Sequence, residues 1–389
     1  MEKIKILFVN DEMQMGGVAR VLNTLLKSLD PDKYEMDLLV LHPHGMLMKD
    51  IPDYVNLLES TPFFYPVDQS LTDLFALPKW GMLLNKLRLL FYMKSGLIKN
   101  KIRKNRKKLI KKHYDVEVAV KEGFCTIFTA YGDSDYKVNW VLTDYSACNF
   151  SKNHMHLLNQ ALSHIDMNVA DSRGALDAYA KVFTINDGCV LHNLMDFSKV
   201  INGLNQDNQL IELNKGLNIC AVARFHPQKS LDRLLAASLY CHEKGINHHV
   251  YLIGDGIMEE QLRFFVKEHN MTYVTFLGVM ANPYPIVKHC DLYVLSSKFE
   301  GFATIVNESF ICGTPVLSTH VSGIVEQIDN PDYGWIVENN QQALNLGLYR
   351  ALSKPKRLKE MKVALSNYTY PNEYNLQQFE RLFHGELKK

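Results

Sequence analysis

The chain has 389 residues, of which 47% are apolar and 22% charged, and its formal net charge is +1. This length exceeds what one small core needs and fits two α/β domains of ordinary size. No apolar run approaches the roughly 20 residues that span a bilayer, and the first nine residues carry Lys3 and Lys5 rather than a signal-peptide core, so we expect a cytoplasmic globular protein.

The first half of the chain alternates short runs rich in Val, Ile and Leu with longer amphipathic stretches. We expect strands at residues 4–9, 36–41, 116–120, 138–142 and 167–170, and a helix over 17–29. Continuously apolar strands that alternate with helices indicate a parallel sheet covered on both faces. Two adjacent glycines, Gly16 and Gly17, open the first helix and permit a tight turn or a close backbone approach.

Residues 79–112 form a strongly biased segment, with thirteen Lys or Arg residues and no Asp or Glu. Large apolar side chains, among them Trp80, Leu84 and Phe91, recur between the cations at helical spacing. A helix of this kind can lie on an anionic membrane surface, and we favour that interpretation over a solvated basic helix. RNA binding is the other use of such a patch, but no RNA-binding motif accompanies it, so we expect no nucleic-acid partner.

A polar, turn-rich stretch at 202–215 interrupts the alternation, and a second series of strands and helices follows. Its expected strands are at residues 217–223, 249–253, 273–277, 291–295 and 315–318. Ligands bind outside the carboxyl ends of strands in open α/β sheets, so a cleft between two doubly wound halves is the expected active site. No GxGxxG motif occurs, which argues against a dinucleotide-dependent dehydrogenase.

The seven cysteines are scattered, with neither a CxxC pair nor a Cys/His cluster at zinc spacing; they stand at positions 125, 148, 189, 220, 241, 290 and 312. This pattern indicates neither a disulfide framework nor a structural metal. We expect reduced thiols in the core.

The segment 296–315 contains two glutamates eight positions apart, directly after an apolar strand. A glycine-containing turn leads into an expected helix over 304–312, which Gly313 ends. The helix dipole and unpaired N–H groups at its start favour a diphosphate, and these groups belong to Gly301, Phe302, Ala303 and Thr304. Glu300 then lies beside whatever the diphosphate carries, and Glu308 can accept hydrogen bonds from ribose hydroxyls.

A strand-to-helix turn at 223–230 carries two cations, Arg224 and Lys229, five positions apart. They can converge on a diphosphate and neutralise the charge that builds on a leaving group. Cations are disfavoured at helix starts, so Lys229 in itself indicates an anionic partner.

These two segments resemble the retaining GT-B glycosyltransferases, notably glycosyltransferase family four, because Glu300 and Glu308 match the two glutamates of the EX7E signature. The resemblance implies an α/β GT-B fold of two Rossmann-like doubly wound domains that face a central cleft. The acceptor-side domain would comprise 1–187 and a C-terminal helix at 370–389 that crosses back, and the nucleotide-sugar-binding domain 188–369. It also implies that Glu300, Arg224 and Lys229 are the catalytic residues, with Glu300 on the donor sugar and Glu308 on the ribose.

Further positions match the family in the same way and are expected to bind substrate: the Gly16 and Gly17 loop, Asn193 in an NxxD segment, and Gly254 in a GDG strand end. The pattern departs at Leu142, which stands where many relatives carry a histidine that contacts the donor sugar. Leucine cannot make that hydrogen bond, although Asp144 lies close enough to offer a polar group. The other interpretation of Leu142 is ordinary packing at the end of a strand.

The resemblance implies transfer of a hexose or N-acetylhexosamine from a UDP-sugar to a lipid-linked or polysaccharide acceptor in bacterial surface glycan biosynthesis. It implies no cofactor and no metal. Asp133 and Asp135 have the DxD form of metal-dependent enzymes, but they precede a first-half strand, far in sequence from the donor elements. Together with the basic segment, these features lead us to expect a peripheral protein on the inner face of the cell membrane.

Two other functions stay open at this point. The first is a non-catalytic GT-B subunit that binds donor or lipid and supports a partner glycosyltransferase, which the missing histidine at Leu142 would explain. The second is a sugar-nucleotide epimerase of the same fold. An epimerase would need no membrane surface, so the basic segment disfavours it.

Overall fold

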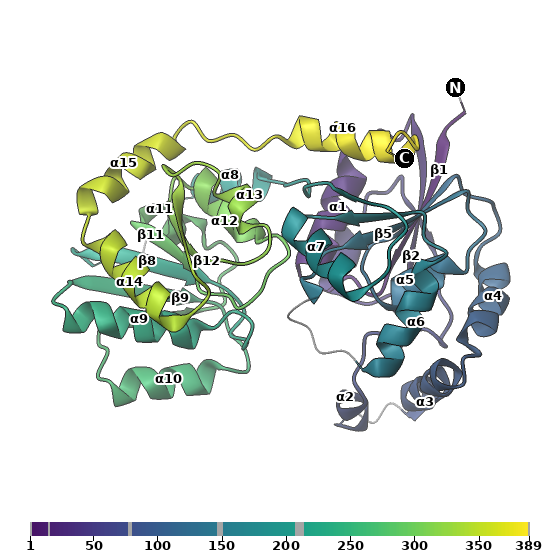
Figure 1. Cartoon of the computed structure of the whole chain (residues 1–389), viewed down its shortest axis with the longest axis horizontal. Coiled ribbons are helices and arrows are strands. Elements are labelled where there is room, and N and C mark those ends of the chain that lie inside the picture. Colours follow the sequence, from purple (N-terminus) through teal and green to yellow (C-terminus); the bar gives the residue numbers. More distant parts are fainter. Residues whose placement is uncertain (1, 15, 77–79, 146–150, 207–213, 388–389) are drawn as a thin grey trace. The chain divides into compact units, whose positions relative to one another are not determined.

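The computed structural model of the chain describes residues 2–14, 16–76, 80–145, 151–206 and 214–387, and it divides into two compact units. The first unit comprises Met1–Met195 together with Pro371–Lys389, and the second comprises Asp196–Tyr370. Each unit contains one parallel sheet between layers of helices (Figure 1). Lys79, Cys148 and residues 207–213 of the polar stretch, all of which the sequence analysis names, lie outside the described residues.

The sheet of the first unit has seven strands in the order β3-β2-β1-β4-β5-β6-β7, all parallel. Their bounds are β1 (Ile4–Asn10), β2 (Tyr34–Val40), β3 (Asn56–Leu58), β4 (Val116–Ala119), β5 (Tyr136–Val141), β6 (Met167–Ala170) and β7 (Gly188–Val190). The strand order reverses between β1 and β4, so the loops that follow these two strands diverge to opposite faces and leave a crevice at their carboxyl ends.

Alternate residues of β1 enter the two cores of this unit, as a strand covered on both faces requires. Ile6 and Phe8 pack in one core, and Leu7 and Val9 pack in the other. The helices of this unit and its short 3-10 helix η1 are α1 (Gly17–Ser28), η1 (Met46–Asp50), α2 (Leu71–Ala76), α3 (Trp80–Lys94), α4 (Ile98–Leu109), α5 (Phe124–Ala130), α6 (Lys152–Leu162), α7 (Arg173–Val182) and α16 (Asn372–Phe383).

The last helix, α16, belongs to the first unit although it follows the whole second unit in sequence. Its Phe383 ring lies edge-on to the Phe8 ring of β1. The ring centroids of Phe379 and of Trp140 in β5 are 5.3 Å apart. Figure 1 shows this helix, in yellow, beside the purple N-terminal strand. Aromatic contacts from the end of the chain therefore complete the first core.

The sheet of the second unit has six parallel strands in the order β10-β9-β8-β11-β12-β13, which reverses between β8 and β11. Its strands are β8 (Leu217–Val222), β9 (His248–Ile253), β10 (Val274–Gly278), β11 (Leu292–Leu295), β12 (Val316–Thr319) and β13 (Gly334–Val337). Its helices are α8 (Ser198–Leu204), α9 (Leu231–Glu243), α10 (Glu259–Glu268), α11 (Tyr284–His289), α12 (Thr304–Ile311), α13 (Ile324–Gln327), α14 (Gln341–Leu352) and α15 (Pro355–Leu365).

Two features differ from the sequence-based expectations. The expected domain boundary at 187/188 would separate β7 from the sheet in which it pairs with β6. In the structure the first unit continues to Met195, so β7 belongs to it. The basic segment is not one helix but two, α3 and α4, because Gly96 adopts φ +72° between them and ends the first.

Candidate active site

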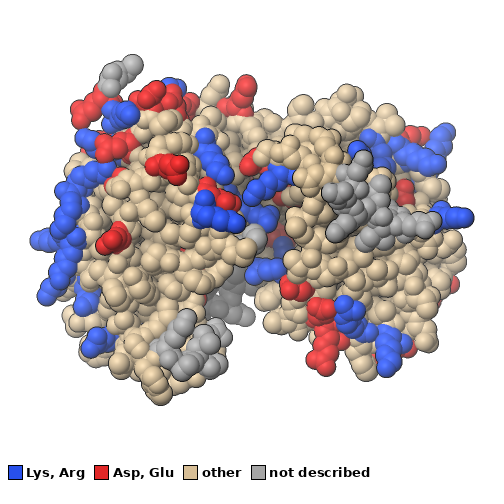
Figure 2. Space-filling view, turned by 180° about the vertical axis from the view of Figure 1, so that it is seen from behind, with Lys and Arg blue, Asp and Glu red and all other residues tan. Residues whose placement is uncertain are grey.

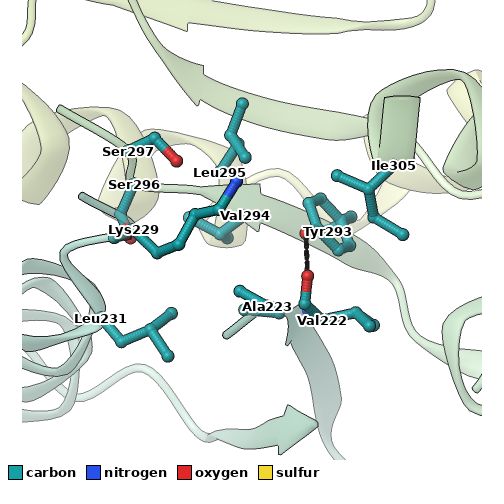
Figure 3. Close-up of a pocket in the computed structure, with 11 residues that line it drawn as sticks. Val222, Ala223, Lys229, Leu231, Tyr293, Val294, Leu295, Ser296, Ser297 and Ile305 are labelled. Carbon is teal, nitrogen blue, oxygen red and sulfur yellow. Dashed lines mark hydrogen bonds between the residues drawn. The ribbon is translucent and has the colours of Figure 1, made fainter. Parts of the chain in front are cut away.

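Two of the sequence-predicted donor residues, Lys229 and Glu300, come together where the second sheet reverses its strand order, at the carboxyl ends of β8 and β11. A pocket opens there, and Figure 3 shows it in close-up. Its lining comes from the ends of both strands and from the turns and helices that follow: Ala221, Val222, Ala223, Lys229, Leu231, Tyr293, Val294, Leu295, Ser296, Ser297 and Ile305. A switch point of this kind is where open α/β sheets bind ligands.

Lys229 and Glu300, which are 71 positions apart, form an ion pair in which Nζ lies 2.6 Å from Oε1. The hydroxyl of Ser297 donates to the same oxygen at 2.6 Å. Glu300 is only 8% exposed, so two donors hold a largely desolvated carboxylate in one position. The structure thus brings together two of the three expected catalytic residues.

Three hydrogen bonds, one between backbones and two from side chains to backbone carbonyls, join the two turns that carry these side chains. The backbone N–H of Lys298 donates to the carbonyl of Gln228 at 2.8 Å. The side-chain amide of Gln228 donates to the carbonyl of Phe299 at 3.0 Å. The Ser296 hydroxyl donates to the Lys229 carbonyl at 2.9 Å. Hydrogen bonds on both sides of the Lys229–Glu300 pair therefore fix its geometry.

Ser230, directly before α9, has a strained backbone. Its φ of +48° and ψ of +48° give a left-handed conformation that glycine adopts without strain, and the residue is buried. Its hydroxyl donates to the carbonyl of Pro227 at 2.9 Å, which offsets part of the strain.

The start of α12 differs in one respect from the expected diphosphate cradle. The N–H of Ala303 donates to Oε1 of Gln327 at 3.2 Å, and Nε2 of Gln327 donates to the Ala303 carbonyl at 2.9 Å. The Gln327 amide also contacts the side chain of Asn307. Of the four expected amide donors, Ala303 is therefore engaged by a side chain that the sequence analysis did not identify.

Glu308 lies half-buried within α12 and Gly301 is buried before it. Burial raises the pKa of the Tyr293 hydroxyl, and the carboxylates of Glu300 and Glu308 add to this shift. Both glutamates of the EX7E pattern are therefore within electrostatic reach of one tyrosine on β11. Phe302 and Thr304 are half-buried between them.

The other two candidate residues of the second unit, Arg224 and Gly254, are not part of the Lys229–Glu300 pair. Arg224 is exposed directly after β8, in the loop that leads to Lys229. Gly254 has φ +132°, and a Cβ there would lie 2.0 Å from the carbonyl oxygen of Ala223. Close backbone approach thus requires this glycine whether or not a ligand binds nearby.

The first-unit candidates lie at the carboxyl edge of the first sheet. Gly16 and Gly17 are exposed at the start of α1, and a Cβ on Gly17 would meet no atom within 4 Å. The fold itself therefore does not require glycine at position 17, which leaves room for an approaching ligand. Asp144 and Asn193 are both buried, after β5 and β7 respectively.

Leu142 directly follows β5, and its side chain packs half-buried against the core that contains β1 and α1. Its N–H donates to Oε2 of Glu122 at 3.0 Å. Burial raises the pKa of Glu122, and the Leu142 N–H and the Thr143 hydroxyl oppose this effect. Glu122 follows β4, and the sequence analysis missed it because no motif marks it.

A second missed pair lies at the same edge. Lys121 Nζ is 2.6 Å from Oδ2 of Asp11, across the point where the strand order reverses. The pair joins the loop after β1 to the loop after β4. By contrast, Asp135 of the DxD-like segment precedes β5, at the opposite edge of the sheet, and pairs with His113.

Residues 205–369, within the second unit, match the model of a family described as glycosyl transferases group 1. A 202-residue region is 29% identical to the N-acetylgalactosamine-N,N'-diacetylbacillosaminyl-diphospho-undecaprenol 4-alpha-N-acetylgalactosaminyltransferase of Campylobacter jejuni, and covers 51% of this chain and 53% of that protein. A 138-residue region is 28% identical to the putative colanic acid biosynthesis glycosyltransferase WcaL of Escherichia coli, covering 33% and 34%. The chain thus spans about half or less of the length of these curated relatives.

Solved structures resemble the chain over nearly all of its length. Anabaena HepE in complex with UDP superposes with a TM-score of 0.70 at 16% identity, covering 98% of this chain and 100% of that one. The lipopolysaccharide outer core galactosyltransferase WaaB gives 0.66 at 15% identity, covering 99% and 100%. At such identity the likeness shows the fold, and it confirms the expected α/β architecture of two doubly wound domains.

Proposed function

We propose that this GT-B protein, whose second unit matches the model of the glycosyl transferases group 1, transfers a sugar from a UDP-sugar donor with retention of the anomeric configuration. The observation that carries the proposal is the Lys229–Glu300 ion pair, with its buried carboxylate, at the switch point of the second sheet. UDP in the complex of the HepE neighbour and the sugar transferases among the relatives support the same class of donor.

The donor roles follow from charge and position. Lys229 and Arg224 would neutralise the diphosphate as the bond to the sugar breaks, together with the remaining N–H groups at the start of α12. Glu300, which Lys229 and Ser297 hold in place, would accept hydrogen bonds from the sugar hydroxyls. These cations perform the neutralisation that a metal performs in DxD enzymes, so the proposed transfer at this site is metal-independent.

For the acceptor we propose a lipid-linked glycan of a bacterial surface polysaccharide, brought to the first unit by docking on anionic membrane. The α3 helix exposes large apolar side chains, with Trp80 at 74% and Phe91 at 62% exposure. The adjacent α4 helix exposes cations, which Figure 2 shows as a column of Lys and Arg along one flank of the first unit; the exposed ones are Arg103, Lys104, Lys107 and Lys108. Apolar anchors beside cations suit a membrane interface.

Membrane docking would place the protein peripherally on the inner face of the cell membrane. Among the described residues, no helix has both the length and the apolar character to cross a bilayer. The undecaprenol-linked acceptor in the name of the Campylobacter relative agrees with a lipid carrier.

The test measures UDP released from a panel of UDP-sugars with and without a lipid-linked acceptor. We expect one donor to be consumed by the wild type, and Lys229→Ala and Glu300→Ala to lower turnover at least a hundredfold. Lys298→Ala is the matched control, because Lys298 is an exposed lysine in the same turn as Glu300.

Equal turnover in Lys229→Ala and Lys298→Ala would contradict the proposed site. A wild type that binds UDP but consumes no donor unless a second glycosyltransferase is present would instead support the non-catalytic subunit, in line with leucine at position 142.

A further inference from the structure

A cluster of metal-ligating side chains lies in the first unit. Glu12 follows β1, and His42 and His44 follow β2. One ligand atom from each of the three lies within 4.8 Å of the other two. No sequence motif marks these residues as metal ligands, because they come from two loops and form no known zinc motif.

Backbone hydrogen bonds between the two loops hold this cluster together. The N–H of His42 donates to the carbonyl of Asp11 at 2.8 Å, and the N–H of Met13 donates to the carbonyl of His44 at 2.8 Å. Gly45 has φ +122°, and a Cβ there would lie 2.1 Å from the carbonyl carbon of Met13. Only glycine permits this approach, so the spacing of Glu12 to both histidines is built into the fold.

Each imidazole is also oriented by a partner at its Nδ1 atom. Nδ1 of His42 lies 3.0 and 3.1 Å from the two carboxylate oxygens of Asp68, whose side chain is almost fully buried. Nδ1 of His44 lies 2.8 Å from the amide of Gln14. Metal-ligating histidines almost always donate their outer ring N–H to an acceptor such as the Asp68 carboxylate, which leaves Nε2 of His42 for the ion. In the ion-bound form Nδ1 of His44 likewise carries the proton, and the Gln14 amide is turned so that its oxygen accepts it.

The two imidazole rings of the cluster stack with their planes 9° apart. Lys121, a nearby cation, is paired with Asp11.

We propose that Glu12, His42 and His44 bind a divalent ion of the zinc class, with Asp68 and Gln14 as the outer residues that orient the two imidazoles. Two histidines and one carboxylate are a common ligand set for such ions and leave at least one position open. Because His44 is exposed, the open position can exchange water or accept an oxygen of a bound molecule. This site does not depend on the proposed transfer.

The test is zinc binding to the full chain, first stripped with a chelator and then titrated with Zn²⁺ by calorimetry and metal analysis. We expect one Zn²⁺ per chain at this site and a loss of affinity of at least tenfold in His44→Ala and in Glu12→Gln. Asp68→Asn should lose about 10–100-fold, as outer partners typically do. Co²⁺ should give a visible absorption spectrum that His44→Ala abolishes.

His113→Ala is the matched control, because His113 also pairs with a carboxylate at 3.0 Å but belongs to no three-residue ligand group among the described residues. Circular dichroism and UDP affinity should stay at wild-type values in His44→Ala, which replaces an exposed side chain. Zinc affinity and stoichiometry that are the same in His44→Ala, Glu12→Gln and wild type would overturn the proposal. So would an equal loss in His113→Ala.

Discussion

Glu300 and Glu308 are alike in sequence but differ in their surroundings. Glu300 is bound on one oxygen by Lys229 and Ser297 and is almost fully buried, whereas Glu308 is half-buried inside α12. Removing Glu300 therefore also deprives Lys229 of its partner. We expect this change to impair the reaction at the sugar end of the donor, and so to lower turnover. Removing Glu308 should affect the bound nucleoside alone.

From this difference we predict opposite kinetic patterns for the two alanine variants. Glu308→Ala should weaken UDP binding by about 1.5–3 kcal/mol, the value of one hydrogen bond to a charged group. Glu300→Ala should mainly lower turnover and leave the Kd of UDP close to that of the wild type. Calorimetric titration with UDP decides the matter, and an unchanged Kd in Glu308→Ala would refute the ribose assignment.

Arg106 shows how a residue can be misjudged from its neighbours in sequence. It stands in the basic run, yet it is 5% exposed and bonds to both carboxylate oxygens of Glu117 at 2.7 Å. Its guanidinium also lies 4.8 Å from the ring centroid of Phe128. Arg106 therefore belongs to the core and not to a membrane-facing surface.

We predict that Arg106→Ala destabilises the protein by about 3–5 kcal/mol, because it leaves the buried Glu117 carboxylate without its cation. Arg103→Ala, an exposed neighbour on the same helix, should change stability by no more than about 0.5 kcal/mol. Urea unfolding of both variants measures the difference. Similar midpoints would mean that the ion pair contributes little to the fold.

At the scale of elements, the interior strands could be predicted, whereas three of the edge strands could not. β1, β6 and β8 are mostly apolar, and their positions agree with the sequence pattern to within one residue at either end. β3, β7 and β13 have three or four residues each and stand at the edges of their sheets, so they carry little of the apolar pattern of a buried strand.

The candidate site divides in a similar way. The turn with Glu300 and the turn with Lys229 each carried a local signal of strand, turn and helix. The contacts of Ala303 with Gln327 and of Leu142 with Glu122 join residues 24 and 20 positions apart without any motif. Such pairings depend on the tertiary packing of several elements, which a linear pattern does not encode.

The start of α1 permits a prediction that separates folding from function. Gly17 is the first residue of that helix and has open space around its Cβ position. Gly17→Ala should therefore leave the protein equally stable, or up to about 1 kcal/mol more stable. If a substrate phosphate approaches this backbone, turnover should fall while the melting temperature does not. Full turnover would remove Gly17 from the substrate-binding residues.

The pair of helices α3 and α4 permits a second prediction at this scale. Replacing Arg103, Lys104, Lys107 and Lys108 by Gln should abolish sedimentation with anionic vesicles, since each surface cation near such a membrane contributes about 1 kcal/mol. Replacing Lys244, Lys354, Lys356 and Lys359, four exposed lysines of the second unit, is the matched control. Sedimentation that survives the first set of changes would exclude α4 as the docking surface.

At the scale of the whole molecule, the same topology occurs twice and holds different chemistry each time. Both sheets reverse their strand order beside the first strand of the unit, at β1 and at β8. At the second reversal stand Lys229 and Glu300; at the first stand Asp11 and Lys121, with Glu12 and the two histidines alongside. A parallel sheet supplies the crevice, and the loops decide what binds there.

This duplication predicts which segments of the chain each ligand should protect from hydrogen exchange. In hydrogen exchange, saturating UDP should slow exchange at 223–230 and 296–311 in the second unit. A ligand at 100 times its Kd stabilises the state that binds it by about 2.7 kcal/mol, so amides that exchange through opening of the site should slow by about a hundredfold. Residues 10–14 and 41–47 of the first unit should be unaffected by UDP and should respond to Zn²⁺ instead. Glu308→Ala should need a higher UDP concentration to reach the same protection. Protection by UDP that appears only in the first unit would contradict the assignment of the donor to the second.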